Sequence, residues 1–420
     1  MLDIFRYIEY GVMIALGFFL IFVVAGIIRI IIGYNKKMVI PHSNKLAKFA
    51  IIIPARDESK VIEANLKSIT ECDYPSKMYD IYIIVEKTDD PTIEIAKKYQ
   101  NTNIFFRENL NNVGKGYGLD ECLRYIYTNN DIYDAFMIFD ADNVVSKDFI
   151  SKLNNYYQAG YDVACGKREN KDWNISLTSG ASALTFTVIN SIQNKPKHKF
   201  NMAVTISGTG FYFKADVFRD YCGWPFHTMT EDYELTTYSF VNGLKSGYVE
   251  DAIFYDEQPI KLWQSIIQRS RWVRGYFQVR KKYKKERIKK IKENKKKSNV
   301  WFQFIGGLPA IIMAVIFIIY LIMCFVYMIV SLVLRDGLYW EYLMRICIGV
   351  GSIYLAIVLF SFILFWIDRK TIKIKWWHRI FVCFYHPIFL FTYVIAAIRA
   401  LFIKNKWEKI EHTINMSCDE

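Results

Sequence analysis

Ala135-Phe136-Met137-Ile138-Phe139-Asp140-Ala141-Asp142 is the stretch that decides the fold of this chain. Five apolar residues in a row are typical of a strand that is buried on both faces of a sheet. Asp140 and Asp142 follow directly, where that strand ends. Open α/β sheets bind their ligands at the carboxyl ends of the strands. The stretch therefore predicts a buried strand and, at its end, a functional site.

The sequence on the N-terminal side of this stretch alternates between predicted strands and predicted helices. The expected strands are 49–53, 81–85 and 104–106, and helical spacing covers 63–69, 92–99 and 118–127. This β-α-β alternation predicts an α/β domain with a mostly parallel sheet and helices on both of its faces. Polar residues follow the strand ends and should meet at one edge of the sheet: Arg56, Asp57, Glu58, Glu86, Asp140 and Asp142.

Composition and hydropathy indicate an integral membrane protein with a large globular domain. The chain has 420 residues, of which 53% are hydrophobic and 17% aromatic. Apolar runs long enough to cross a bilayer cover 11–34, 305–334, 343–367 and 380–403. We therefore expect an N-terminal membrane anchor (1–45), a cytoplasmic α/β domain (46–260), an interfacial amphipathic helix with a basic segment (261–304), and a C-terminal membrane region with a tail (305–420). The first run lacks a cleavage site, so it is predicted to be an anchor and not a signal peptide.

Positive charge marks both ends of the central domain. Lys36, Lys37, Lys45 and Lys48 follow the first apolar run, and residues 280–297 contain 12 Lys or Arg against two Glu. We interpret both clusters as the positive-inside signal of a multi-pass protein of the cell membrane, with the domain in the cytoplasm. A site for anionic lipids is the alternative interpretation of 280–297. Nucleic acid is not an expected partner, and the eight scattered cysteines predict neither disulfides nor a zinc site.

The C-terminal tail conflicts with a simple count of membrane crossings. Three crossings after a cytoplasmic domain would leave 404–420 outside, whereas Lys404, Lys406 and Lys409 indicate an inside location. An interfacial or re-entrant last segment would remove the conflict, and Pro387 is a suitable position for a break in it.

Asp140 and Asp142 are candidate ligands of a divalent cation. Mg²⁺ and Mn²⁺ prefer carboxylate and phosphate oxygens, and they commonly bind through one or two carboxylates together with the phosphates of a substrate. The alternative is structural, because acidic residues often end a strand or cap the next helix. The buried strand before this pair and the motifs that follow it favour metal binding.

Two later motifs supply a carboxylate and a set of aligned polar side chains. In Thr230-Glu231-Asp232 the acidic residues would occupy the first turn of a helix capped by Thr230, which can hold the Asp232 carboxylate rigidly. Gln268, Arg271 and Trp272 are spaced i, i+3 and i+4, so they share one face of a helix. An amphipathic helix at the membrane surface would also explain this last pattern, and the two interpretations are compatible.

Taken together, these motifs resemble the membrane-bound inverting glycosyltransferases of family 2, which include cellulose, chitin, hyaluronan and poly-N-acetylglucosamine synthases. The resemblance covers about 49–276 and implies a GT-A-like domain that binds a nucleotide sugar. Asp140 and Asp142 match the DxD motif of the family, Asp232 the catalytic Asp of its TED box, and Gln268, Arg271 and Trp272 its QxxRW box. Pro54, Arg56 and Glu58 match the loop around the nucleoside.

The resemblance implies roles for these residues. Asp232 would be the catalytic base, Asp142 with Asp140 would hold Mg²⁺ or Mn²⁺, and Glu231 and Trp272 would lie beside the acceptor. The residues expected to bind the UDP-sugar are Pro54, Arg56, Glu58, Glu86, Lys115, Asp140, Gln268 and Arg271. Where many members have an Asp that contacts the base, this chain has Glu86, with Asp89 and Asp90 as alternatives.

The expected reaction is a single displacement that transfers a sugar with inversion at its anomeric carbon. Glucose and N-acetylglucosamine are both open as the donor sugar. A growing polysaccharide, with coupled export, is the first expectation for the acceptor, and a lipid that receives a single sugar is the second. An inactive membrane scaffold or transport subunit is the alternative outside enzymology. The sequence gives no oligomeric state.

Overall fold

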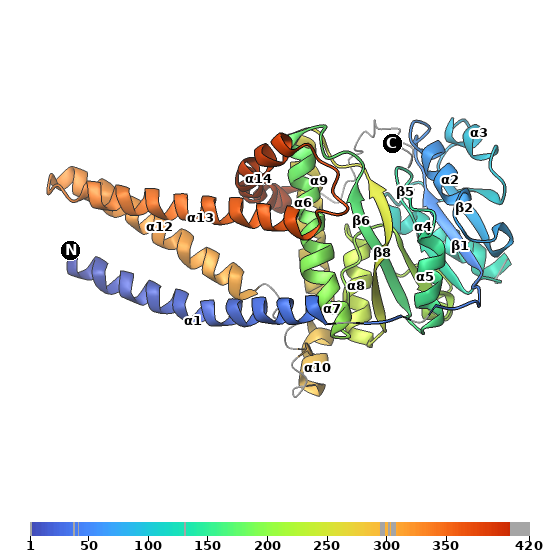
Figure 1. Cartoon of the computed structure of the whole chain (residues 1–420), viewed down its shortest axis with the longest axis horizontal. Coiled ribbons are helices and arrows are strands. Elements are labelled where there is room, and N and C mark those ends of the chain that lie inside the picture. Colours follow the sequence, from blue (N-terminus) through green and yellow to red (C-terminus); the bar gives the residue numbers. More distant parts are fainter. Residues whose placement is uncertain are drawn as a thin grey trace.

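The computed structural model describes residues 2–36, 38–40, 42–129, 132–294, 299–300, 303 and 308–403. An α/β domain lies at one end of the molecule, and a bundle of long helices projects from it (Figure 1). The basic tail 404–420, part of the basic segment (295–298) and Lys37 lie outside the described residues.

One sheet forms the centre of the domain, with the strand order β3-β2-β1-β4-β7-β6-β8-β5. The strands are β1 Phe49–Pro54, β2 Tyr79–Val85, β3 Thr102–Phe106, β4 Ala135–Ile138, β5 Val144–Val145, β6 Val163–Asn170, β7 Phe211–Lys214 and β8 Ser246–Asp256. Strands β1 to β4 are parallel, as predicted, and Ile51 pairs with both Ile81 and Met137. β7 is antiparallel to β4 and β6, and β5 is antiparallel to β8. The sheet is therefore mixed. Two successive strands that are neighbours can be parallel only if the chain between them crosses over the sheet, and the chain between β6 and β7 makes no such crossover.

Helices cover both faces of the sheet, as expected. The helices of the domain are α2 Ile62–Thr70, α3 Thr92–Ala96, α4 Lys115–Asn129, α5 Phe149–Gln158, α6 Leu177–Thr187, α7 Lys195–Lys199, α8 Glu231–Asn242, α9 Leu262–Lys282 and α10 Lys284–Glu293, with the π-helical segment Val188–Asn194 and short 3₁₀ helices at Ser76–Met78 and Ala215–Val217. One hydrophobic core packs α2, α3 and α5 against one face, and a second packs α4 and α8 against the other. Helix α3 is shorter than predicted because its last turn tightens, as Tyr99 N–H donates to Ala96 O.

Four helices among the described residues are long and apolar enough to cross a membrane, in the predicted arrangement of one before the domain and three after it. They are α1 Leu2–Asn35, α12 Leu308–Leu334, α13 Tyr339–Ile367 and α14 Trp376–Phe402. Helix α12 packs against both α1 and α13, and these three form the projecting bundle.

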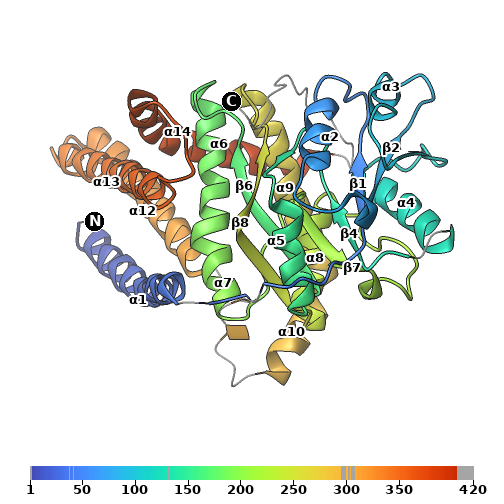
Figure 2. The same ribbon diagram turned by 45° about the vertical axis from the view of Figure 1, so that its right-hand side comes forward.

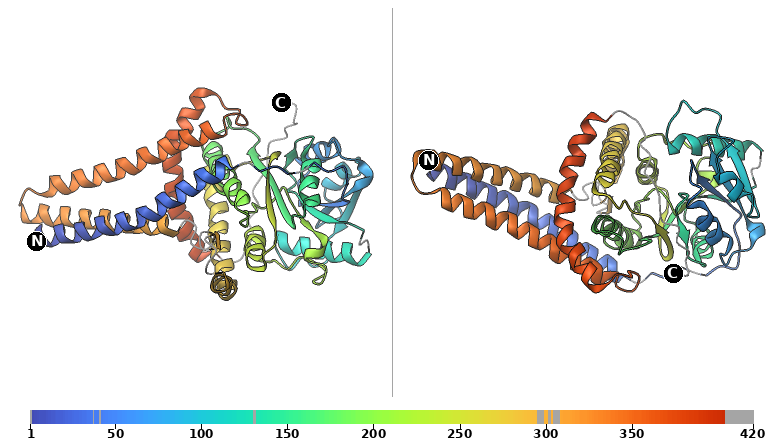
Figure 3. Two further views of the ribbon diagram at one scale, coloured as in Figure 1. Left: turned by 60° about the horizontal axis from the view of Figure 1, so that its bottom comes forward. Right: turned by 90° about the horizontal axis from the view of Figure 1, so that it is seen from above.

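Helix α14 differs from the other three in direction and in its contacts. It runs across the direction of α1, α12 and α13, at the domain end of the bundle (Figure 3). At its start Lys375 N–H donates to Asn174 Oδ1, and near its end Ala400 O accepts from Arg274 at 3.1 Å. Both ends of α14 are therefore held to domain elements, and the helix packs most extensively on α9 and to an equal, smaller extent on α6 and α13.

Helices α6, α7 and α9 stand between the sheet and the bundle (Figure 1), and Figure 2 shows α6 and α7 beside β6 and β8 on the side that faces the bundle. Arg269 of α9 is completely buried; its guanidinium donates to Phe389 O and Thr392 Oγ1 of α14 and stacks on the ring of Phe389. A buried guanidinium with partners on another helix fixes the two helices together. The membrane-side layer is thus a rigid support for the carboxyl edge of the sheet.

Candidate functional site

The end of β4 carries the predicted pair Asp140 and Asp142 in a network of hydrogen bonds. Asp140 N–H donates to Thr209 Oγ1 at 2.8 Å, and Asn65 Nδ2 donates to Asp140 O at 3.1 Å. Asp142 is buried, and its Oδ2 accepts from Glu257 N–H at 3.2 Å. The loop after β4 is therefore fixed by the side chains of Asn65 and Thr209 and by the backbone N–H of Glu257.

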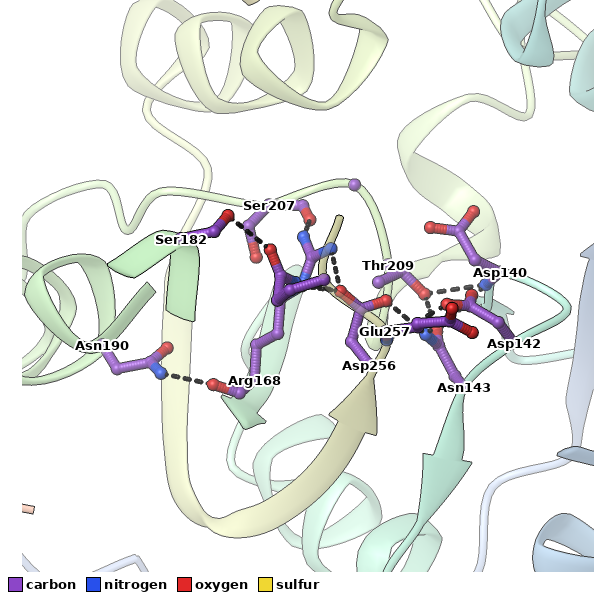
Figure 4. Close-up of polar contacts among 12 residues, drawn as sticks. Asp140, Asp142, Asn143, Arg168, Ser182, Asn190, Ser207, Thr209, Asp256 and Glu257 are labelled. Carbon is purple, nitrogen blue, oxygen red and sulfur yellow. Dashed lines mark hydrogen bonds and ion pairs between the residues drawn. The ribbon is translucent and has the colours of Figure 1, made fainter. Parts of the chain in front are cut away.

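A second acidic pair, Asp256 and Glu257, ends β8 and faces the first pair (Figure 4). Asn143 lies between the two pairs and donates to Asp256 Oδ1 at 3.0 Å. Arg168 of β6 forms an ion pair with Asp256 and donates to Ser207 O at 2.7 Å. Sequence reasoning missed Arg168, Asp256 and Glu257, although a strand that ends in two carboxylates was the signal already used for Asp140.

Burial governs the ionisation of Asp256. It raises the pKa of the Asp256 carboxyl to about 7; Arg168 opposes this effect, and the charges of Asp142 and Asp140 reinforce it. Several carboxylates close together in a buried place repel one another, and a bound divalent cation relieves that repulsion. Among the described residues no three acidic or other ligating side chains converge on one point, so Asp140 and Asp142 would hold Mg²⁺ or Mn²⁺ together with the phosphates of a substrate.

Lys115, at the start of α4, connects the metal pair to the predicted base. Its ammonium donates to Asp140 Oδ1 at 2.5 Å and to Gly208 O at 2.7 Å. Burial alone would lower the pKa of Lys115, but the carboxylates of Asp140, Glu231 and Asp232 raise it. Lys115 is thus a fixed positive charge among the three predicted acidic residues.

Asp232 lies in the first turn of α8, as predicted, with its carboxylate close to Gly208. A Cβ at Gly208 would lie 3.5 Å from Asp232 Oδ2, and the positive φ of 87° at Gly208 also favours glycine. Asp232 Oδ1 accepts from Tyr233 N–H at 2.7 Å. Burial raises the pKa of Asp232, against the opposing effects of the Tyr233 N–H and Lys115. Burial, with the adjacent charge of Asp232, raises the pKa of Glu231 to about 7.

The expected cap by Thr230 is wrong. Thr230 occupies the N-cap position, but its hydroxyl forms no capping hydrogen bond and has no partner among the described residues. The reason is its packing against α9: a Cβ at Gly275 would lie 2.3 Å from Thr230 Oγ1. The start of α8 is instead held by Gln278 of α9, which accepts from Met229 N–H at 3.1 Å.

Gln268, Arg271 and Trp272 lie on α9, as predicted, and are partly buried. The Trp272 ring packs edge-on against Phe186 of α6 at 5.9 Å, and Phe186 in turn lies under the guanidinium of Arg168 at 3.9 Å. Trp272 is therefore linked through Phe186 to Arg168, which forms the ion pair with Asp256. Gln268 Oε1 is buried without a hydrogen-bond partner among the described residues, which suits a group that accepts from a ligand.

The predicted nucleoside edge contains Pro54, Arg56, Glu58 and Glu86. Pro54 ends β1, and Glu58 N–H donates to Thr92 Oγ1 at 3.2 Å. Glu86, after β2, pairs with Arg56 at 3.1 Å and with the buried Arg107 at 2.8 Å. Each Glu86 oxygen has one of these ion-pair contacts and keeps a further lone pair, so Glu86 can still accept a hydrogen bond from a nucleobase.

The carboxylate of Asp90 forms hydrogen bonds within its own loop. Its carboxylate accepts from Asp57 N–H at 2.9 Å and from Thr92 N–H at 2.9 Å, and its side chain is buried. Asp90 therefore shapes the loop and caps α3, and it is unsuited to contact a base. Of the three candidates for the base contact, Glu86 and the exposed Asp89 are left.

Comparison with known proteins identifies the family. The model of the family described as "Glycosyltransferase like family 2" matches residues 47–275, more than half of the chain. The chain belongs to this family. The matched range contains β1 to β8 and the first part of α9, so it includes all four motifs and ends just after Trp272.

The curated relatives match over the same part of the chain. A probable glycosyltransferase of Bacillus subtilis, YdaM, is 26% identical over 247 residues, which are 55% of this chain and 56% of that protein. A β-monoglucosyldiacylglycerol synthase of Trichormus variabilis is 24% identical over 259 residues, 58% of this chain and 51% of that protein. Glucomannan 4-β-mannosyltransferase 7 of Arabidopsis thaliana is 24% identical over 233 residues, 53% of this chain and 41% of that protein. The chain spans about half the length of the curated relatives it matches.

A solved structure shares the fold over nearly the whole chain. The mannosyltransferase PcManGT of Pyrobaculum calidifontis, solved with GDP-Man and Mn²⁺, is 14% identical with a TM-score of 0.51. The match covers 91% of this chain and 99% of that one. The GT-A-like fold with membrane-length helices, expected from the sequence, is thereby confirmed.

Proposed function

We propose that this protein transfers a hexosyl group from a UDP-sugar to a membrane-held acceptor, with inversion, at the cytoplasmic face of the cell membrane. The observation that carries the proposal is the convergence of the β4 and β8 carboxylates, Lys115 and the start of α8 at one edge of the sheet. Family membership and relatives that are glycosyltransferases support the reaction class.

Asp232 is proposed as the base that removes the proton of the acceptor hydroxyl while that oxygen attacks the anomeric carbon. Burial raises the pKa of Asp232, which makes its carboxylate a stronger base. Asp140 and Asp142 would hold Mg²⁺ or Mn²⁺, which when bound supplies positive charge for the diphosphate. Lys115 keeps Asp140 in place, and Arg271 adds charge for the same diphosphate. A single displacement converts an α-linked donor into a β-linked product.

A lipid is the acceptor that the architecture favours over a growing polysaccharide. Only α1, α12 and α13 project as a bundle among the described residues, and the most apolar window of each is between 0% and 11% buried. Three helices packed side by side are too few to enclose a path for a sugar chain. Lipid head groups, in contrast, reach the site directly from the bilayer surface beside α9. We therefore replace the expected polymer export with transfer to a lipid.

The arrangement of α14 leads to a proposal about topology. If α1, α12 and α13 cross the membrane and α14 lies along its surface, the chain crosses three times. Residue 403 then lies on the same side as the domain, which agrees with the basic residues that follow it. We expect a cysteine introduced after residue 403 and Cys222 of the domain to react with a membrane-impermeant maleimide only in inside-out vesicles. Labelling of the new cysteine only in right-side-out vesicles would contradict the proposal.

A panel of nucleotide sugars tests the proposed function. Purified protein in nanodiscs with diacylglycerol should release nucleotide from one UDP-hexose, and a chelator should abolish the release.

Asp142→Ala should weaken metal-dependent nucleotide binding tenfold or more, about 1.4 kcal/mol. If no donor is consumed with any metal, the proposal is wrong, and an inactive scaffold becomes the better interpretation.

Trp272→Ala separates a role in acceptor binding from a purely structural one. If the indole positions the acceptor, the variant should lose transfer to lipid but keep donor binding and slow donor hydrolysis, because water still reaches the anomeric carbon. Phe186→Leu is the matched control, since it removes the ring contact of Trp272 and leaves the indole. Nucleotide release and glycolipid formation are measured in parallel. Equal loss of both by Trp272→Ala would assign the residue to the support of α9.

A further inference from the structure

Helix α10 and the end of α9 form a basic surface that the proposed reaction does not use. Six lysines on it are exposed: Lys281, Lys282, Lys284, Lys285, Lys289 and Lys292. Phe277 and Ile288, 61% and 38% exposed, lie among them. The acidic residues on these turns are Glu286 and Glu293, and Glu293 pairs with Lys289 at 3.8 Å. Exposed lysines interleaved with exposed apolar side chains are typical of a helix that lies on an anionic bilayer.

The position of α10 suits a membrane surface. A single residue, Tyr283, separates α10 from α9. Helix α10 lies at the domain end of the bundle, level with α7 and α9 along the long axis of the molecule (Figures 1 and 3). If the three bundle helices cross a bilayer, lysines at that level would reach its phosphate layer.

The same surface is tied to the helix that carries Asp232. Glu234 of α8 is completely buried, forms an ion pair with Lys282 and accepts from the Tyr283 hydroxyl at 3.2 Å. Lys282 and Tyr283 are the junction between α9 and α10. A buried carboxylate needs these partners, so the position of the junction and the position of α8 depend on each other.

Two further contacts make this dependence close. Arg287 and Ile291 form the buried side of α10, and α10 packs on α8. A Cβ at Gly243, which ends α8, would lie 3.2 Å from Lys290 Nζ. Helix α8 is thus in contact with the basic segment at both of its ends, and Asp232 is two residues before Glu234.

We propose that the lysine face of α10 binds the head groups of anionic phospholipids, and that this contact positions Asp232 through Glu234. Anionic lipid would then activate the enzyme by ordering the start of α8. Glu234 and Lys282 are positioning residues in this scheme, because they act on the base and not on the substrate. The activation part rests on the proposed glycosyltransferase function, whereas lipid binding by α10 does not.

The experiment compares the full-length protein in nanodiscs of phosphatidylcholine and in nanodiscs with about a third phosphatidylglycerol, a content at which clustered lysines bind anionic lipid. Hydrogen–deuterium exchange should slow at 284–293 and at 228–240 when phosphatidylglycerol is present. The turnover number should rise several-fold, and the KM for the donor should stay unchanged, because only the base is repositioned.

Three variants make the result decisive. Replacing Lys284, Lys285, Lys289 and Lys292 by Gln should abolish every response to phosphatidylglycerol and leave turnover in phosphatidylcholine as in the parent. Replacing the exposed Lys77, Lys97, Lys98 and Lys147, on other parts of the domain, should leave the responses intact. Glu234→Gln should keep the slower exchange of α10 but lose the responses of α8 and of turnover.

Each outcome decides one part of the proposal. Equal exchange of 284–293 in both lipids would overturn lipid binding by α10, whether or not the protein transfers sugar. Slower exchange of α10 with no change at 228–240 would overturn the link to Asp232. A protein that consumes no donor but still shows both exchange responses would contradict the proposed function and leave the lipid site standing.

Discussion

Asp232→Asn is expected to lower glycosyl transfer by about 10²–10⁴-fold, the usual contribution of a general base. Asparagine keeps the shape of the side chain, and its Oδ1 can still accept from Tyr233 N–H. The start of α8 is also held by Gly275 and Gln278 of α9, so the fold should be unchanged. Nucleotide binding should stay within a few-fold of the parent, because Asp232 is not one of the proposed metal ligands.

The pH dependence of transfer provides the control for this variant. A base must be ionised, so the parent rate should rise with pH through a pKa that burial places above the ordinary value of Asp. Glu231→Gln removes the neighbouring carboxyl but not the burial that raises the pKa of Asp232, so this rise should stay at the same pH, with a much smaller loss of rate than in Asp232→Asn. Turnover at saturating donor is measured from pH 5 to 9. Transfer by Asp232→Asn at more than about a tenth of the parent rate would exclude Asp232 as the base.

Arg168→Met is expected to cause the largest loss of stability, and the loss should grow with pH. The buried Asp256 would lose its ion-pair partner, which at full ionisation costs about 3–5 kcal/mol. Burial already raises the pKa of Asp256 to about 7 from 3.8, and without Arg168 it rises further. A raised carboxyl pKa gives stability that is present at low pH and lost as pH rises through the folded-state pKa.

The variant should therefore unfold near the parent temperature at pH 5.5 and about 6 °C or more below it at pH 8.5. Adding Asp256→Asn to Arg168→Met should restore most of the loss at pH 8.5, because no buried charge is left. Arg219→Met, which breaks an exposed pair with Asp216, is the matched control and should change little at either pH. A loss that is the same at both pH values would show that Arg168 acts by packing on Phe186 and not by charge.

The first half of the sheet, and the meeting of several motif residues at its edge, could be predicted from the sequence. Strands 49–53 and 81–85 and the stretch before Asp140 are continuous apolar runs, and their order along the chain determines parallel neighbours. Asp232 and Lys115 also come together, since each follows or begins an element at the carboxyl edge.

The second half of the sheet and its acidic pair were not predicted, for a physical reason. β7 has only four residues and pairs antiparallel to β4, and its place depends on the long excursion through α6 and α7, which local patterns do not encode. Asp256 was missed because its importance lies in the contact with Arg168, 88 residues away. Thr230 was assigned as a cap on local grounds, whereas the tertiary contact with Gly275 takes its side chain away.

The buried Arg269 has a consequence for the size of the product. If the protein transfers sugar to a lipid and α14 lies along the membrane surface, as proposed, the contacts of Arg269 between α9 and α14 would hold the reacting carbon at one height above the bilayer. A lipid whose free hydroxyl lies near the head-group layer reaches this height, whereas a lipid already extended by sugars carries its terminal hydroxyl beyond it. The number of additions should then be limited by reach, with no separate termination step. Mass spectra of the product lipids should show a narrow distribution of sugar number, and a broad ladder would contradict this expectation.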